Sequence, residues 1–258
     1  MAIELMAGAV TERLFTLAWP LTRISALIMT APVFSQGSVS LNIRISLVLV
    51  LTWLVWPLVE WPKLDPVSAP GLVWLIQEAA IGAMMGLSLQ MVVAAFIVGG
   101  QAMSSTLGLA MANMVDPNMG QVPIISQILV IMGTLIFVGL DGHAMAIGLV
   151  LESFRTIPVA QAWDVMSAIK ALLVWSSIIF VGGLLLALPV LVTLLFINVG
   201  LGVVTRAAPS LNIFAVGFPI MLMVGLVLLW VTLTSAGVRI QWLWMRGISE
   251  LQQLAGVV

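Results

Sequence analysis

Asp141 and His143 are the residues of this chain whose types and spacing first suggest proton chemistry. They lie within a long apolar tract, and an ionisable group inside a membrane is a functional candidate by default. On a helix, however, side chains two positions apart do not face each other. No G-x-S-x-G or other nucleophile signature accompanies them. We therefore expect a structural role for both near a membrane boundary. The rival hypothesis, an intramembrane hydrolase, requires a hydroxyl group within reach of His143.

The rest of the composition argues against most other chemistry. The chain has no cysteine and one histidine, so it offers no thiolate site and few metal-ligand combinations. It contains no G-x-x-x-x-G-K-[ST] loop for nucleotide phosphates. Its net charge of −1 gives no sign of nucleic-acid binding. We expect no catalytic residue, no cofactor and no metal ion.

The hydropathy of the chain predicts an integral membrane protein without a soluble domain. Hydrophobic residues make up 62% and charged residues 7%, against about 25% charged in an average soluble domain. The mean hydropathy is +1.23. Ten tryptophans and no tyrosine are present, and most tryptophans stand near the ends of apolar tracts, as in an interfacial belt. These are Trp53, Trp56, Trp61, Trp74, Trp163, Trp175, Trp242 and Trp244.

About six apolar tracts predict an all-α fold of membrane helices. Six crossings place both termini on one side, and the excess of Lys and Arg on that side predicts a cytoplasmic location for the termini. The third tract exceeds the roughly 20 residues of one crossing, so we expect a steep tilt, a break near Gly99-Gly100 or an end beyond the membrane. A short tail after the sixth tract has the spacing of an amphipathic helix. The tracts run over about 14–32, 43–59, 71–109, 124–151, 171–205 and 211–236.

The segment 198–220 separates the last two tracts and is expected to be a broken, polar pivot. It carries Arg206 together with prolines, asparagines and glycines that interrupt a helix. Pro209 and Pro219, with Asn212 between them, also resemble the discontinuous helices of transporter sites. A secondary transporter is therefore a rival hypothesis. Against it, the halves show no inverted repeat, and no second acidic group is evident deep in a span.

Three further features predict helix packing and closure. Gly82 and Gly86 form a G-x-x-x-G pair that allows close approach of another helix. Arg23 lies inside the first span and must face protein or water, because a lipid-facing arginine costs at least ~2.5 kcal/mol. Methionines are dense in one third of the chain and suit either a soft seal or ordinary helix packing. They are Met84, Met85, Met91, Met103, Met111, Met114 and Met119.

The stretch from Met111 to Pro123 is predicted to be a loop that connects two apolar tracts. Asp116-Pro117, Gly120 and Pro123 are strong helix breakers. For Met111, Met114 and Met119, which lie in or beside this loop, a sealing role is as well supported as ordinary packing.

Four stretches, in this order along the chain, resemble the FliR family of the flagellar type III export gate. They are M-T-A-P-V-F at 29–34, V-D-P-N-M-G-Q-V-P at 115–123, D-G-H with E-S-F-R-T-I-P between 141 and 158, and G-L-G-V-V-T-R-A-A-P-S-L-N-I-F-A-V-G-F-P at 200–219. The resemblance covers nearly the whole chain. Injectisome SctT-like relatives share the architecture, and the fit is closer to the flagellar branch.

The resemblance implies a structural, pore-forming subunit that passes unfolded flagellar proteins across the bacterial inner membrane. It implies assembly with FliP-like and FliQ-like membrane subunits, and with an FlhB-like subunit, in a complex raised toward the periplasm. Residues 1–170 would be a FliP-like part and 171–258 a FliQ-like hairpin with the amphipathic tail. The alternatives are the equivalent injectisome subunit or a stand-alone transporter or channel.

The resemblance also implies roles for two sets of residues. A plug-like pore loop would contain Met111, Asn113, Met114, Asp116, Pro117, Met119, Gly120 and Pro123. Subunit packing and the bend of the hairpin would involve Arg206, Pro209, Asn212, Gly217, Pro219, Gly82 and Gly86.

Overall fold

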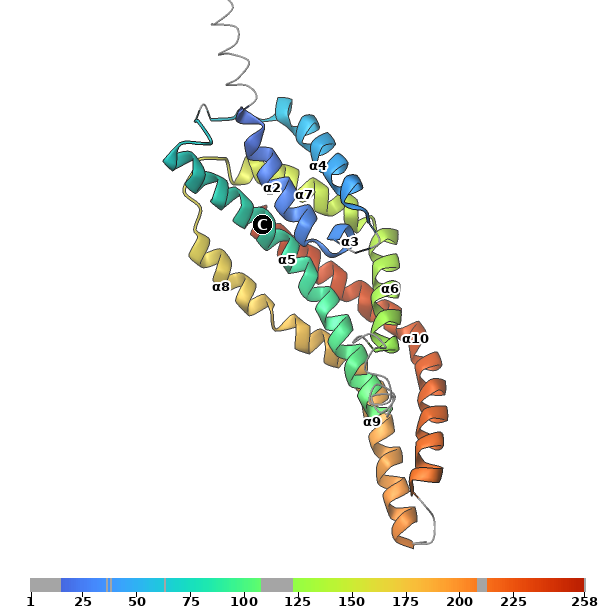
Figure 1. Cartoon of the computed structure of the whole chain (residues 1–258). Coiled ribbons are helices and arrows are strands. Elements are labelled where there is room, and N and C mark those ends of the chain that lie inside the picture. The colour runs from blue at the N-terminus through green and yellow to red at the C-terminus, as the bar shows by residue number, and fades with distance from the viewer. Residues whose placement is uncertain are drawn as a thin grey trace, which may run out of the picture. The chain divides into compact units, whose positions relative to one another are not determined.

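A computed structural model of the chain is built from helices (Figure 1). It describes residues 15–35, 37, 39–62, 64–107, 123–207 and 213–257, and every regular element in these ranges is helical. The all-α expectation is therefore confirmed for the described residues. The elements are α2 (Ala18–Thr30), α3 (Pro32–Ser35), α4 (Leu41–Val55), the 3-10 helix η1 (Trp56–Leu58), α5 (Ala69–Thr106), α6 (Ile124–Gly139), α7 (Gly142–Thr156), α8 (Val165–Trp175), α9 (Ile178–Ala207) and α10 (Ile213–Leu254).

Among the described residues, three helical stretches are long and apolar enough to cross a membrane, namely Leu41–Leu58, Ala69–Thr106 and Val165–Ala207. Two bent pairs raise the number to as many as five if each pair is one span. They are α6 with α7, and the two parts of α10. The first predicted tract contributes α2, whose 13 residues are shorter than one crossing.

The third predicted tract is one continuous helix, α5, of 38 residues. Gly99 and Gly100 lie inside it, so the break considered at that point is absent. At about 1.5 Å per residue α5 is roughly 57 Å long, against a hydrocarbon core of about 30 Å. A steep tilt or an end beyond the bilayer accommodates this length.

The fourth predicted tract is divided by a sharp bend, which corrects the sequence-based map, whereas the fifth forms one candidate span, Val165–Ala207, with a local interruption. The fourth is interrupted at Asp141, whose φ of 55° is left-handed; aspartate tolerates this conformation better than most residues. The fifth is interrupted at Ser176 and Ser177, between α8 and α9. The Ser176 hydroxyl donates to the carbonyl of Leu173 at 2.6 Å, in the manner of serines that compete with the helical backbone for its carbonyls.

The pivot expected over 198–220 is much shorter than predicted. Helix α9 continues to Ala207 and α10 begins at Ile213, so most of the segment is helical. Pro219 lies inside α10, where it removes one backbone donor, a loss that membrane helices tolerate. Pro209 and Asn212 lie outside the described residues.

The chain packs as two compact units. Unit 1 contains residues up to Gln90, Asp141–Ser176 and Arg246–Val258, and unit 2 contains Met91–Leu140 and Ser177–Met245. Helices α5 and α10 contribute to both units. The boundary near Lys170 between a FliP-like and a FliQ-like part is a division of a different kind and stays a prediction.

Unit 1 is organised around α2, which lies beside α4 (Figure 1). Trp19, Ile24, Leu27 and Ile28 of α2 are fully buried. Arg23, on the same helix, is also fully buried and forms an ion pair with Glu78 of α5. The expectation that Arg23 faces protein or water is thereby confirmed: its side chain faces the protein interior.

Helix α2 approaches α5 closely at Gly82 and Gly86. A Cβ at Gly82 would collide with the backbone carbonyl oxygen of Arg23, and one at Gly86 with Thr30. The Thr30 hydroxyl also reaches the Ala83 carbonyl at 3.4 Å. In the folded chain this G-x-x-x-G pair therefore serves the contact between α2 and α5.

Gly82→Ala should destabilise the protein, because α2 must move away from α5 to accommodate the new methyl group. Overpacking of this kind typically costs about 1–3 kcal/mol. The midpoint of thermal unfolding in mild detergent, followed by tryptophan fluorescence, should fall. Gly148→Ala is the matched control, since no atom lies within 4 Å of a Cβ built at that glycine of α7. Equal midpoints for the two variants would contradict this contact.

Candidate functional site

The predicted pore loop joins α5 to α6, and its residues from Met111 to Gly120 lie outside the described part of the chain. Pro123, its last residue, is described and caps the start of α6 with φ −57° and ψ 142°. That extended conformation suits a proline before a helix. The site is therefore built from the two segments that hold the ends of the loop, both of which belong to unit 2.

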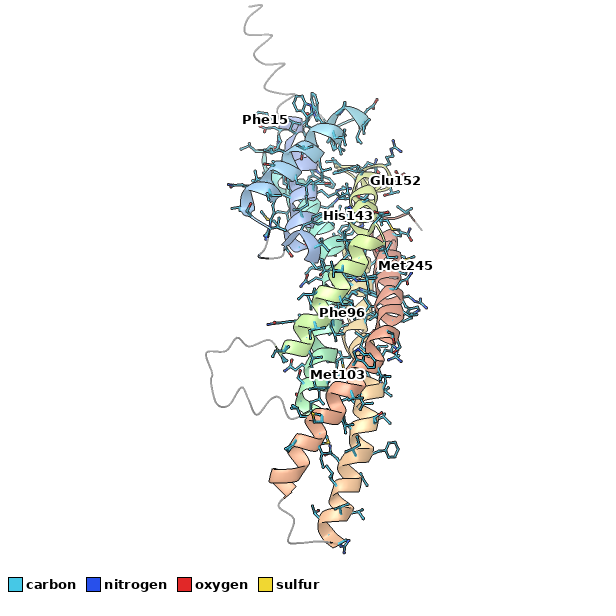
Figure 2. All side chains as sticks on the ribbon, turned by 90° about the vertical axis from the view of Figure 1, so that its right-hand side faces the viewer. Phe15, Phe96, Met103, His143, Glu152 and Met245 are labelled. Carbon is cyan, nitrogen blue, oxygen red and sulfur yellow. The ribbon has the colours of Figure 1, made fainter. Side chains whose placement is uncertain are left out.

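The end of α5 is fixed by buried apolar contacts. Met103 and Leu107 are 3% and 1% exposed, and Figure 2 shows Met103 near the end of this helix. Leu107 fills the space beside Gly225 of α10, where a Cβ would collide with its side chain. The glycine thus makes room for the residue that precedes the loop.

The start of α6 is fixed against α5 itself. The Ser126 hydroxyl donates to the carbonyl of Ile97 at 3.0 Å. Gly100 lies directly against Ser126, and a Cβ at Gly100 would collide with the serine backbone. The two helices that carry the loop are therefore in close contact at its base.

An aromatic cluster adds α10 to this contact. The Trp244 indole is fully buried and its Nε1 donates to the Gly133 carbonyl of α6 at 2.9 Å. Its ring lies 4.4 Å from that of Phe137 and 5.7 Å, edge to face, from that of Phe96, measured between centroids. Phe96 occupies the space beside Gly133. Three helices are thereby joined through one tryptophan.

Helix α9 packs on the same stretch of α5 through small residues. A Cβ at Gly183 would lie 3.1 Å from the backbone nitrogen of Gly99, and one at Gly182 would lie 3.0 Å from the Ala95 Cβ. Small residues of this kind allow membrane helices to pack with their backbones in close approach. Unit 2 is thus a tightly packed base for the loop.

A small cavity lies within unit 2 beside the ends of the loop. All of its lining residues except Thr232 are apolar, and none of them is charged. Its lining residues are Met103, Ile125, Ile128, Leu129, Leu186, Leu229, Thr232 and Ala236. Such a lining offers contact surface for apolar groups and no chemistry.

The methionines outside the loop that are most buried fill the protein interior. Met84, Met85 and Met103 are 8%, 0% and 3% exposed. These three follow the ordinary-packing interpretation. The methionines of the loop, Met111, Met114 and Met119, lie outside the described residues, and their sealing role stays a prediction.

The described residues predicted for the hairpin bend have different surroundings. Arg206 is exposed in the last turn of α9, where a positive charge is favourable beside the negative end of the helix dipole. Gly217 is buried and Pro219 is exposed, both within α10. Their role in contacts with other subunits stays a prediction.

Asp141 and His143 do not form a shared site in the described structure. Asp141 is exposed and supplies the left-handed residue before α7. His143 is half-buried, and its Nδ1 has no hydrogen-bond partner among the described residues. Within those same ranges, no group of three His, Cys, Asp or Glu side chains could hold a metal ion.

The partner of Arg23 was not predicted from the sequence. No second acidic group was expected deep in a span, whereas the structure shows Glu78 fully buried. The available signal was the presence of one cation and one acid in different apolar tracts. Opposite charges in membrane helices tend to pair with each other.

The similarity to known proteins extends over nearly the whole chain. Residues 14–246 match the model of a family described as bacterial export proteins, family 1. The chain is 40% identical over 212 residues to the flagellar biosynthetic protein FliR of Pectobacterium carotovorum, covering 82% of this chain and 81% of that one. Proteins of the same name from Escherichia coli and Bacillus subtilis are 36% and 27% identical, covering 82% and 92% of this chain and 81% and 93% of theirs.

Trp244→Phe should weaken unit 2, because the Gly133 carbonyl loses the indole donor and the smaller ring leaves space. The hydrogen bond alone is worth about 0.5–1.5 kcal/mol, and Trp244→Ala should cost about 3–5 kcal/mol. Chemical unfolding in detergent measures both losses. Trp230→Phe is the control, since Trp230 is 75% exposed. A loss for Trp230→Phe as large as that for Trp244→Phe would contradict the role of the cluster.

Proposed function

The chain belongs to the FliR family of bacterial export proteins, and from this premise we propose that it is a structural, pore-forming subunit of the flagellar type III export gate. Family membership and the apolar helices make it a membrane component of the flagellar export apparatus. The proposal goes further, to a subunit that lines the path by which unfolded flagellar proteins cross the bacterial inner membrane. The match of residues 14–246 to one export family is the observation that carries it.

In this proposal the loop from Met111 to Pro123 acts as a plug in the closed pore. Asp116, Pro117 and Gly120 shape the loop, and its methionines close the path. Flexible thioether side chains adapt to varied cargo sequences, and an apolar constriction excludes ions by dewetting when the path is empty. The packed base of unit 2 supports this proposal, because a plug needs a firm attachment on both sides.

The proposed partners are FliP-like and FliQ-like subunits and an FlhB-like subunit. Arg206, Pro209, Asn212, Gly217 and Pro219 would set the bend of the α9–α10 hairpin and contact these neighbours. Exposed apolar side chains on the hairpin, such as Phe196 (72%) and Trp230 (75%), support contact with other apolar surfaces. The assembled complex would sit in the inner membrane, raised toward the periplasm.

The proposed subunit makes and breaks no covalent bond. Its contribution is a closable path, and the energy for export comes from other parts of the apparatus. This role is consistent with the absence of a nucleotide-binding loop from the sequence.

The assembly is tested by purifying the tagged chain from its native membrane in mild detergent and weighing the complex by native mass spectrometry. One copy of this chain with several copies of other small helical membrane proteins is the expected result. A monomer or homodimer that persists when the neighbouring subunits are co-expressed would overturn the proposal.

The plug is tested by deleting Val115–Gln121. We expect the complex to assemble and the membrane to leak ions, because the closing side chains are gone while the α5 and α6 contacts remain. Ion flux into vesicles and the mass of the complex are the two measurements. A variant with a Gly/Ser segment of the same length in place of these residues is the control for loop length, and it should leak as well. A deletion that abolishes assembly without a leak would show that the loop is structural.

A further inference from the structure

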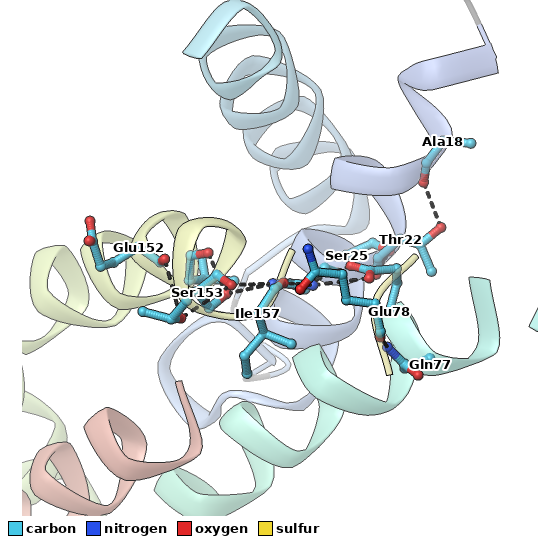
Figure 3. Close-up of polar contacts among 12 residues, drawn as sticks. Ala18, Thr22, Ser25, Gln77, Glu78, Glu152, Ser153 and Ile157 are labelled. Atoms are coloured by element: carbon cyan, nitrogen blue, oxygen red, sulfur yellow. Dashed lines mark hydrogen bonds and ion pairs between the residues drawn. The ribbon is translucent and has the colours of Figure 1, made fainter. Parts of the chain in front are cut away.

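The Arg23 side chain makes five hydrogen bonds in the interior of unit 1. Figure 3 labels the residues that accept them, Glu78, Ser153 and Ile157. Two go to the Glu78 carboxylate, from Nε at 2.6 Å and from Nη2 at 3.0 Å. The other three go to the end of α7. Nη1 donates to the Ser153 carbonyl at 2.8 Å and to the Ser153 hydroxyl at 3.0 Å, and Nη2 donates to the Ile157 carbonyl at 2.9 Å.

Charge balance accounts for only the first two of these bonds. A buried arginine requires an opposite charge nearby, and Glu78 supplies it from α5. A lysine could also place a positive charge beside this carboxylate, as a single point charge without the bidentate geometry. The contacts to α7 need the planar, forked donor set of a guanidinium.

The end of α7 is where such donors have most effect. The last carbonyls of a helix have no partner within it, and the negative end of the helix dipole lies there. Helix α7 ends at Thr156. The next residue, Ile157, has φ −125° and ψ 78°, so the helix has no left-handed glycine cap. The Ser153 carbonyl also accepts from the Ile157 backbone N–H at 2.9 Å. The guanidinium of Arg23 therefore caps α7 at the Ile157 carbonyl and adds a second donor at the Ser153 carbonyl.

Neighbouring contacts converge on the same turn of α7. The Arg23 guanidinium carbon lies 4.3 Å from the centre of the Phe154 ring. Trp61 meets that ring edge to face, with 5.4 Å between centroids. The Thr156 hydroxyl donates to the Ala255 carbonyl at the end of α10. Four segments of unit 1 thus meet at the last turn of α7: α7 itself, α2 through Arg23, the connection after η1 through Trp61, and the end of α10 through Ala255.

We propose that Arg23 is the positioning residue of unit 1: it caps the C-terminal end of α7 from α2, and Glu78 is the counter-ion that permits an arginine there. In this arrangement the guanidinium fixes where α7 ends and where the connection to α8 begins. The inference concerns the folded chain and stands whether or not the chain lines a pore.

The absence of cysteine from the chain allows single-cysteine reporters. Val159→Cys, just after α7, reports on the capped turn, since Val159 is 9% exposed. Met166→Cys is the accessible control in α8, at 60% exposed, and Leu129→Cys is the buried control in unit 2, at 3% exposed. Each reporter is made in the full chain in its native membrane. The rate of reaction with N-ethylmaleimide is then measured by back-titration with a maleimide polymer and a gel shift.

Arg23→Lys is the decisive variant, because it keeps the charge pair and removes the fork. The rate at Val159→Cys should rise by about tenfold or more, the effect expected for loss of one charge-assisted hydrogen bond. The rates at Met166→Cys and Leu129→Cys should stay unchanged. The neutral pair Arg23→Gln with Glu78→Gln should behave in the same way. The exchanged pair Arg23→Glu with Glu78→Arg should fail to restore protection, since a carboxylate at 23 cannot donate to the α7 carbonyls.

Wild-type protection of Val159→Cys in Arg23→Lys or in the exchanged pair would overturn the inference and leave Arg23 as one half of an ion pair. Loss of Leu129→Cys protection in Arg23→Lys would overturn it too, because Arg23 would then support the whole chain. Neither result bears on the mass of the export complex, so failure of the gate proposal would be seen separately.

Discussion

The buried pair of Arg23 and Glu78 is the interaction on which the first unit depends. Burying an unpaired charge among apolar side chains costs several kcal/mol. This cost is far larger than the free energy that any single apolar contact in that unit contributes. Once both charges are buried, α2 and α5 must meet at one register, because the two Glu78 oxygens accept from Nε and Nη2 at once. The three remaining bonds extend that register to α7. A single side chain thus determines how three helices sit together.

The second unit is held without buried ion pairs among its described residues, through close backbone approach. Between membrane helices the hydrophobic effect is weak, so packing and interhelical hydrogen bonds carry the association. Gly99, Gly100 and Gly183 bring α5 against α6 and α9, and Trp244 adds a donor to an α6 carbonyl. Close approach at glycines occurs in both units, at Gly82 and Gly86 in the first unit as well. The first unit differs from the second in adding a buried ion pair to this packing.

The sequence predicts the class of fold and the family well, because hydropathy and breaker residues act locally. Local signals fail where distant residues decide the outcome. Arg23 could be placed inside protein from its charge alone, yet its contact with α7 could not be found, since the partners there are backbone carbonyls that no residue type reveals. Pro219 was expected to interrupt a helix, but α10 continues through it. Conversely, the residues around Asp141 were expected to belong to one apolar span, but Asp141 separates α6 from α7. Residues 115–123 of the loop form one of the four stretches that resemble the family, and the described structure shows the helices that hold the two ends of this loop.

The contacts of Arg23 also have a consequence for the way the chain is made. Glu78 follows Arg23 by 55 residues, and Ser153 follows it by 130. At about 5–20 residues per second, translation delivers the carboxylate roughly 3–11 s after the arginine, and α7 roughly 7–26 s after it. Over that interval Arg23 lacks the partners that it has in the folded chain. Because an arginine facing lipid is costly, α2 requires a polar or protein-lined environment until those contacts form.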